Sequence, residues 1–484
     1  MAGIGFLLRK LASQDNFSGI IRAYFHSSVI AVGPWILIVL AIGAITFSTY
    51  PIVGLGEANE FLAVVIYNFF FSFILTGGLY LVCARYVADC LYLRNVAPIP
   101  GIFITSMIFF LIPAIVISTI FYTFYATMTP LSTICSIVNF TFLCEIWMIM
   151  LYLGCLRNFR AITFSWILGV FVVTLLAIFW GKIYGSSGML TGFNVGLIFL
   201  LASLKASVLA EYPYRFRKAK EFPFYFRYYK GLFWSGLFLY GGMWIDKVIM
   251  WSAPEAITHL NNLRTYPAYD GGMFLSYLSI IPIMALFIFS LETNFYDSYI
   301  LYIQHIERNG PFALIEEEKV NIFAKITENA RVFFVLQGSV SLITIAVAPT
   351  LFEWIGADYL QLGIFRQGAL GAFFGALNLF IVIIFSYFDS QDNMLKVTAT
   401  MLCSNILFTF ITLFLGFPFY GYGYSLSMIL TFFVGATLLV RFLNQLTYHI
   451  FITNIVKRQT ITEHYEDNEL RIGTGNVHNA DRAL

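Results

Sequence analysis

The chain has 484 residues, of which 59% are hydrophobic and only 11% are charged. A soluble protein carries about 25% charged residues. The composition of this chain therefore excludes a soluble protein. Apolar stretches of about 20 residues recur along the chain, each long enough to cross a bilayer as a helix. The mean hydropathy of +0.80 agrees, and the sequence therefore predicts an all-α integral membrane protein. The net charge of +2 gives no indication of nucleic-acid binding.

Residues 1–26 open the chain with apolar side chains at helical spacing from Ile4 to Leu11. Basic residues are spread through this segment instead of preceding a compact apolar core, which is not the pattern of a cleavable signal peptide. We expect an amphipathic helix at residues 3–25, lying on the cytoplasmic interface of the membrane.

Hydropathy predicts twelve transmembrane helices, separated by segments rich in Gly, Pro and polar residues. They are expected at 27–48, 61–84, 101–125, 133–156, 161–184, 188–210, 231–253, 271–293, 331–353, 363–388, 394–417 and 421–445.

A basic, aromatic linker at 211–230 divides these spans six and six. Because transporters are often built from repeated halves, we expect two pseudo-symmetric six-helix lobes, at 27–210 and 231–456. The second lobe includes two amphipathic cytoplasmic helices at 294–330. A polar cytoplasmic tail is expected at 457–484. The linker itself suits contact with anionic lipid heads or with a cytoplasmic partner.

The distribution of Lys and Arg predicts the orientation. With the N-terminus in the cytoplasm, 24 of the 28 basic residues fall on the inside. Three fall outside, namely Lys182, Arg264 and Arg366, and Lys247 lies within a span. Both termini are therefore expected in the cytoplasm.

The first spans of the two halves are weakly similar. "AVGPWILIV" at 31–39 aligns with "YGGMWIDKV" at 240–248, with a Gly, a Trp, an Ile and a Val in common. The alignment places Asp246 and Lys247 where the first half has apolar residues. We therefore expect these two charges to be an addition to the second half. They are not expected to be a structural requirement of both halves.

Asp246 and Lys247 are the leading candidate residues of the substrate pathway. A charge near the bilayer centre costs about 2.5–3.5 kcal/mol, and such residues face the bundle interior or a wet cavity. Neighbouring residues on a helix point about 100° apart, so the two are not expected to form a self-contained ion pair. Lys247 shares its face with Tyr240, Trp244 and Trp251, an aromatic stripe that suits a polysaccharide passage. The alternatives are a lysine that extends to the outer interface, a structural partner for Asp246, and an aromatic face toward lipid.

Glu145, mid-way along the fourth predicted span, is the second candidate. It is expected to be deeply buried, either as a neutral, proton-exchanging carboxyl or as a packing carboxyl with a hydrogen-bond partner. Lys205 is expected to anchor at the headgroups. Five amides share the property of lying within predicted spans, where they line a polar path or join helices: Asn68, Asn194, Gln337, Asn378 and Asn405.

Sequence motifs of catalysis are absent. There is no GxxxxGK[ST] loop and no HExxH motif, the six histidines are scattered, and the six cysteines lie in or beside apolar runs without metal-ligand spacing. We expect no enzymatic activity, no metal and no cofactor.

Several segments resemble the PelG family of inner-membrane exopolysaccharide transporters. These are "MAGIGFLLRKL", "GIIRAYFHSSVIAVGPW", "RYVADCLY" and "GMWIDKVIMW", and the similarity extends over essentially the whole chain. The family belongs to the multidrug/oligosaccharidyl-lipid/polysaccharide flippase superfamily. The resemblance implies export of a hexosamine-rich polymer in biofilm-forming bacteria. It also implies a complex with a cytoplasmic glycosyltransferase and with membrane scaffold and cyclic-di-GMP-sensing subunits.

The sequence therefore predicts a bacterial inner-membrane polysaccharide transporter. It leaves open whether a cavity between the lobes opens to alternate sides or a conduit stays open for a growing polymer. Two other functions remain possible on the same fold: a proton- or sodium-coupled exporter of small molecules, and a non-transporting membrane scaffold for a polysaccharide synthase.

Overall fold

The computed structural model describes most of the chain. The described residues are 17–92, 95–153, 159–212, 222–284, 295–308, 310–356 and 361–454. The first part of the predicted interface helix, residues 213–221 of the basic linker and the predicted tail lie outside these ranges.

The first five helices pack on one another, and we call them the N-terminal bundle. They are α2 (Phe17–Val53), α3 (Leu55–Tyr92), α4 (Ile99–Phe124), α5 (Pro130–Leu153) and α6 (Phe159–Glu211). α5 lies between α3, α4 and α6, and α2 packs along α6. Apolar side chains cover most of each helix, as expected for helices that contact lipid on one side and protein on the other.

α6 is two consecutive helices joined at a sharp break. Gly185 has φ 63° and ψ −143°, a backbone conformation that glycine adopts without steric cost. The Glu57 carboxylate from α3 accepts a hydrogen bond from the Ser186 backbone N–H at 2.8 Å, which satisfies a donor that the break leaves free. The two parts of α6 coincide with the predicted spans 161–184 and 188–210.

The later helices form a second group, the C-terminal bundle. They are α8 (Lys230–Met250), α9 (Pro267–Tyr277), α12 (Phe312–Ile355), α13 (Gln361–Tyr387), α14 (Gln391–Leu415) and α15 (Tyr422–Asn444), with the short elements α7 (Phe222–Tyr228), η1 (Leu278–Ile280), α11 (Tyr296–Glu307), η3 (Phe417–Phe419), α16 (Leu446–Tyr448) and η4 (His449–Asn454). α8 packs along α14, while α13 contacts α9, α12 and α15.

Nine helices of the described part are long and apolar enough to cross a membrane. α8 and α9 are not among the nine. Two cytoplasmic helices are predicted at 294–330, and two helices, α11 and the start of α12, lie in this segment. α11 is separate, but the second helix continues without a break into the predicted span 331–353, because no Gly or Pro interrupts the sequence between Phe312 and Pro349 except Gly338.

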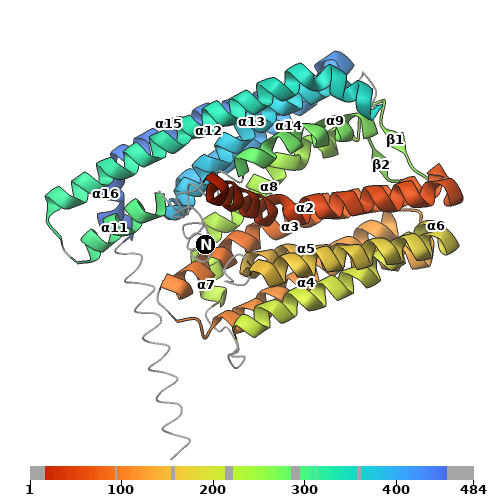
Figure 1. The fold of residues 1–484 in the computed structure, drawn as a ribbon, viewed down its shortest axis with the longest axis horizontal. Coiled ribbons are helices and arrows are strands. Elements are labelled where there is room, and N and C mark those ends of the chain that lie inside the picture. The colour runs from red at the N-terminus through yellow and green to blue at the C-terminus, as the bar shows by residue number, and fades with distance from the viewer. Residues whose placement is uncertain are drawn as a thin grey trace, which may run out of the picture.

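α12 is the longest unbroken helix of the C-terminal bundle. Its 44 residues span about 66 Å at 1.5 Å per residue, roughly twice the thickness of a bilayer's hydrocarbon core. Figure 1 shows that the start of α12, together with α11, extends beyond the ends of the neighbouring helices.

The two bundles meet where α3 packs along α8. The helices approach closely because glycines face each other at the crossing. A Cβ added at Gly236 would collide with the Gly77 carbonyl oxygen, and one at Gly78 would lie 2.7 Å from the Phe233 carbonyl oxygen. Small residues at a helix crossing allow this backbone contact in a membrane.

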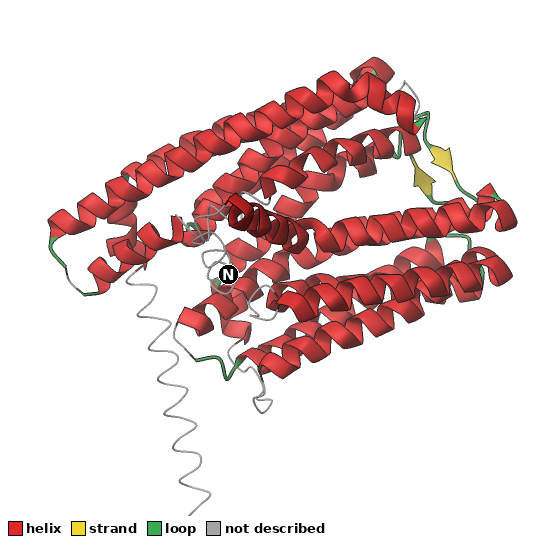
Figure 2. Cartoon of the chain, in the orientation of Figure 1, coloured by secondary structure: helices red, strands yellow, loops and turns green. Residues whose placement is uncertain are grey.

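A short hairpin makes a second connection between the bundles at one end of the molecule, which we call the hairpin end. β1 (Ile257–Thr258) and β2 (Arg264–Thr265) pair antiparallel and form the only strands of the described residues (Figure 2). The sequence predicts this segment only as a break between spans. Its tip crosses to the N-terminal bundle, where the Thr127 N–H donates to the Asn261 carbonyl oxygen at 3.1 Å.

The glycine crossing predicts a difference between two alanine substitutions. Gly236→Ala should lower the thermal unfolding midpoint in detergent or nanodiscs, because the new methyl group displaces α3. Gly43→Ala in α2 meets no atom within 4 Å and should be neutral or stabilising, since Ala is favoured over Gly in a helix by about 1 kcal/mol. Equal midpoints for the two variants would contradict the close contact.

Candidate functional site

Asp246 and Lys247 lie at the centre of the C-terminal bundle and form an ion pair. The Lys247 Nζ is 3.0 Å from both oxygens of the Asp246 carboxylate, and the two side chains are 2% and 0% exposed for Lys and Asp. The expectation that these neighbours do not pair is wrong. Their Cβ atoms do diverge around the helix, but the four-carbon lysine stem folds back toward the helix N-terminus, the direction in which helical side chains lean. Nζ thereby also reaches the Met243 carbonyl oxygen at 3.3 Å.

Lys247 does not extend to the interface, because three aromatic rings enclose its ammonium. Nζ lies 5.0 Å from the ring centre of Trp244, 4.7 Å from that of Tyr277 and 4.9 Å from that of Tyr424. It also donates to the Tyr277 hydroxyl at 3.2 Å. A desolvated cation gains about 2 kcal/mol from such ring faces. The cage joins α8, α9 and α15 around one charge.

Two further polar groups extend this cluster through α9. The Tyr269 hydroxyl donates to Asp246 at 2.9 Å. The Asp270 carboxylate accepts from the Trp251 indole N–H at 3.0 Å and from the Tyr266 backbone N–H at 3.3 Å. Buried charges need such partners. The cluster thus holds two carboxylates and one ammonium.

The aromatic residues predicted to share a face with Lys247 divide between two positions. Trp244 lies against the Lys247 ammonium as part of the cage. Tyr240 and Trp251 instead face α3, where Tyr240 packs 5.6 Å from Phe73 and Trp251 stacks 4.3 Å from Tyr67. All three therefore lie at or beside the contact between the bundles. The aromatic stripe is a seam between protein helices and does not face lipid.

The same seam continues to the hairpin end. The Tyr67 hydroxyl of α3 donates to the Arg264 carbonyl oxygen at 2.7 Å, and it accepts from the Arg264 backbone N–H at 3.3 Å. Phe70 packs edge-on against Trp244 at 5.0 Å and against Trp251 at 5.4 Å. The charged cluster of one bundle is thus connected by two tryptophans to the surface of the other.

The family of the chain is shown by its sequence. The model of PelG, the exopolysaccharide exporter family (EPS-E), matches residues 1–451. The chain belongs to this family. No match is found among curated proteins.

Solved structures with the same fold are transporters of the MOP superfamily. One is an inward-facing multidrug resistance MATE family transporter, at 14% identity over 86% of this chain and 99% of that one, with a TM-score of 0.57. Another is a MOP superfamily transporter from Pyrococcus furiosus, at 12% identity over 87% and 96% of the chains, with a TM-score of 0.60. A third is a MATE protein in complex with MaD5, at 13% identity over 88% and 96%, with a TM-score of 0.61. At these identities the similarity shows the fold.

Glu145 of this PelG-family chain lies apart from the cluster, in the N-terminal bundle. Its carboxylate accepts from the Lys205 ammonium at 2.7 Å, and the two side chains are 17% and 37% exposed for Glu and Lys. Glu145 is thus not deeply buried, and it has a hydrogen-bond partner on the neighbouring helix α6, as in the alternative of a packing carboxyl. Lys205 lies near the end of α6, where a headgroup anchor was expected, and its ammonium is paired with the Glu145 carboxylate.

Of the two roles predicted for the amides within the spans, lining a polar path or joining helices, the four asparagines show the second. Asn68 donates to Asn139, and Asn139 donates to Asn194, each at 2.9 Å. This chain connects α3, α5 and α6 within the N-terminal bundle. In the other bundle Asn378 donates to the Met428 carbonyl oxygen at 3.0 Å and Asn405 to that of Gly242 at 2.8 Å. Interhelical hydrogen bonding thus accounts for these four amides.

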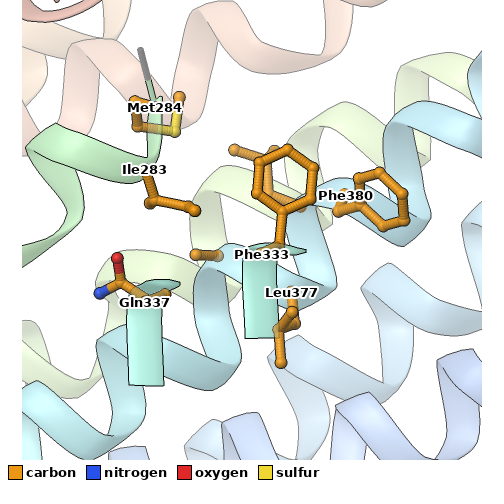
Figure 3. A pocket seen from close by; sticks show the side chains of 8 residues that line it. Ile283, Met284, Phe333, Gln337, Leu377 and Phe380 are labelled. Atoms are coloured by element: carbon orange, nitrogen blue, oxygen red, sulfur yellow. The ribbon is translucent and has the colours of Figure 1, made fainter. Parts of the chain in front are cut away.

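Gln337 borders a small apolar cavity between α12, α13 and the segment after η1. Figure 3 shows its amide beside Ile283, Phe333 and Leu377. The volume of about 10 Å³ accommodates one water at most, which is far too small for a sugar. Within the described residues no group of His, Cys, Asp and Glu is arranged to hold a metal ion.

The buried ion pair predicts a specific pattern of stabilities. Lys247→Met leaves the Asp246 charge buried without its partner and should lower the free energy of unfolding by about 3–5 kcal/mol. The double variant Asp246→Asn, Lys247→Met should recover most of this loss. Chemical or thermal unfolding of the purified variants measures the effect.

Lys205→Met is the matched control, because it breaks an ion pair that solvent reaches. It should cost about 1 kcal/mol or less. If Lys247→Met were no more harmful than Lys205→Met, the central pair would not carry the energy assigned to it.

Proposed function

We propose that this chain translocates a hexosamine-rich exopolysaccharide across the bacterial inner membrane, between two six-helix lobes. The PelG-family match over residues 1–451 carries this proposal. The transporter fold, and the aromatic seam where the bundles meet, agree with it. Sugars pack their C–H faces on aromatic rings, and Tyr67, Trp244 and Trp251 would become available to them when the bundles separate.

The twelve-span arrangement is supported by helix contacts that recur in the two bundles. α5 lies between α3, α4 and α6, and α13 lies between α9, α12 and α15 in the same order along the chain. The break at Gly185 makes two passes of α6. α8 and α9 correspond to two further predicted spans, 231–253 and 271–293. Their polar residues make them less apolar than the nine helices named above. The basic-residue distribution supports an orientation with both termini in the cytoplasm and the hairpin end on the opposite side of the membrane.

The partners we propose are a cytoplasmic glycosyltransferase and membrane scaffold and cyclic-di-GMP-sensing subunits. The start of α12 supports a partner on the cytoplasmic side. Phe312 and Val320 are 67% and 61% exposed there, beside the acidic run Glu316–Glu318. Exposed apolar side chains beyond the membrane are typical of interaction surfaces.

A coupled exporter of small molecules is the second candidate function. Asp246 and Asp270 favour it, because a buried and a partly buried carboxylate lie in one cluster with a single ammonium, which is paired to Asp246, and proton-coupled carriers need ionisable groups inside the membrane. This candidate predicts pH-dependent efflux from vesicles that contain the chain alone, whereas the polysaccharide proposal predicts none.

Linking the bundles at the hairpin end tests the proposed movement. Thr127 and Leu260 are both exposed, and the Thr127 hydroxyl lies 3.4 Å from the Leu260 carbonyl oxygen. In cells, Thr127→Cys with Leu260→Cys, joined by a short reducible thiol cross-linker, should stop secretion of hexosamine-containing polymer. Reduction should restore secretion, because the bundles can separate again.

The two single-cysteine variants, treated with the same cross-linker, are the controls and should secrete normally. Undiminished secretion by the linked protein would exclude an alternating opening at this end. It would favour a fixed conduit or a scaffold.

A further inference from the structure

Asp270 occupies a position between the charged cluster and the contact of the bundles. Both of its carboxylate oxygens face the Trp251 indole N–H, at 3.0 and 3.3 Å. Trp251 is 4% exposed, and its ring lies almost parallel to that of Tyr67, with an interplanar angle of 17°. Since Tyr67 belongs to α3, the carboxylate of one bundle orients the aromatic ring that contacts the other bundle.

The stack on Tyr67 is reinforced from the hairpin. The Tyr67 hydroxyl exchanges two hydrogen bonds with the backbone of Arg264, and the Arg264 guanidinium donates to the Ala253 carbonyl oxygen at 3.0 Å. Trp251 and the hairpin therefore hold one side chain of α3 from two directions. We call Asp270, Trp251, Tyr67 and Arg264 the outer clasp.

Asp270 has no cation of its own in the described ion pairs. The neighbouring ammonium of Lys247 is bonded to Asp246, and the charge of Asp246 repels that of Asp270. The other ionisable groups near the clasp are Tyr266 and Tyr269 on the same segment, Glu255, which accepts from Tyr420, and His259, which shares a hydrogen bond with Thr265. Asp246 is fully buried, whereas Asp270 retains partial solvent exposure and lies in the segment that follows the hairpin.

We propose that Asp270 is a proton-binding site that controls whether the hairpin end is closed. The charged carboxylate holds Trp251 through a charge-assisted hydrogen bond, about twice as strong as a neutral one. A proton from solvent that binds a carboxylate oxygen removes the charge and adds an O–H donor facing the indole N–H. The remaining carbonyl oxygen can then accept only a neutral hydrogen bond from Trp251, so the anchor weakens and the stack on Tyr67 loosens. Acidification at the hairpin end therefore opens the clasp.

The clasp would regulate the proposed transport function, and its biological role rests on that function. The proton binding and the opening themselves do not depend on it. Its test uses the purified protein in nanodiscs without polymer, so that failure of the clasp and failure of export are separate results.

Spin labels on the two bundles report the clasp directly. Phe124 at the end of α4 and Phe414 near the end of α14 are 84% and 86% exposed and are not part of it. Cysteines at these positions, in a chain without its native cysteines, carry the labels. Electron–electron distance measurement should show a narrow distribution at pH 8 and a shift to longer, broader distances at pH 5.

Two substitutions assign the response to Asp270. Asp270→Asn has nearly the same shape without the charge, and should give the long distances at both pH values. Trp251→Phe retains a ring for the stack but lacks the indole donor, and should also give long distances at pH 8. A pH response that persists in Asp270→Asn, or short distances in both variants at pH 8, would overturn the proposal.

His259 and Glu255 titrate in the same region and provide the matched controls. His259→Asn and Glu255→Gln should each retain the full shift between pH 8 and pH 5. Loss of the shift in either variant would move the proton to that residue and overturn the assignment to Asp270.

Discussion

The pairing of Lys247 is the interaction on which the C-terminal bundle depends. An ammonium in an apolar interior is tolerated only when its charge and its donors are satisfied. Here the carboxylate of Asp246, a carbonyl oxygen of its own helix and the Tyr277 hydroxyl do so. Because the aromatic cage comes from α8, α9 and α15, meeting the needs of one cation fixes three helices against one another.

The two bundles solve the same packing problem with different chemistry. In the N-terminal bundle a chain of neutral amides from Asn68 to Asn194 joins the helices, and its ion pair of Glu145 and Lys205 lies where solvent reaches it. In the C-terminal bundle the central group is charged. The fully buried ion pair of the described residues therefore lies in the C-terminal bundle, whereas the pairs of the N-terminal bundle, Glu145–Lys205 and Arg85–Asp89, retain partial exposure.

Much of the fold was predictable from the sequence, whereas the site was predictable only in part. The spans follow from hydropathy, and Asp246 and Lys247 stand out because charge is rare in this chain. Their pairing was missed because helix geometry describes where Cβ atoms point, and a lysine stem reaches much further. Asp270, Tyr277 and Tyr424 were missed because their roles depend on which helices meet. Asp270 had one visible signal, its place directly before a predicted span.

The unbroken length of α12 has a mechanical consequence. A loop between the two predicted segments would let each move by itself, but a continuous helix behaves as a rod. A partner that binds the exposed first turns near Phe312 would therefore hold one end of a rigid helix. The other end of this helix packs against α13 inside the C-terminal bundle. A displacement of such a partner would be carried along α12 to the bundle that holds the clasp.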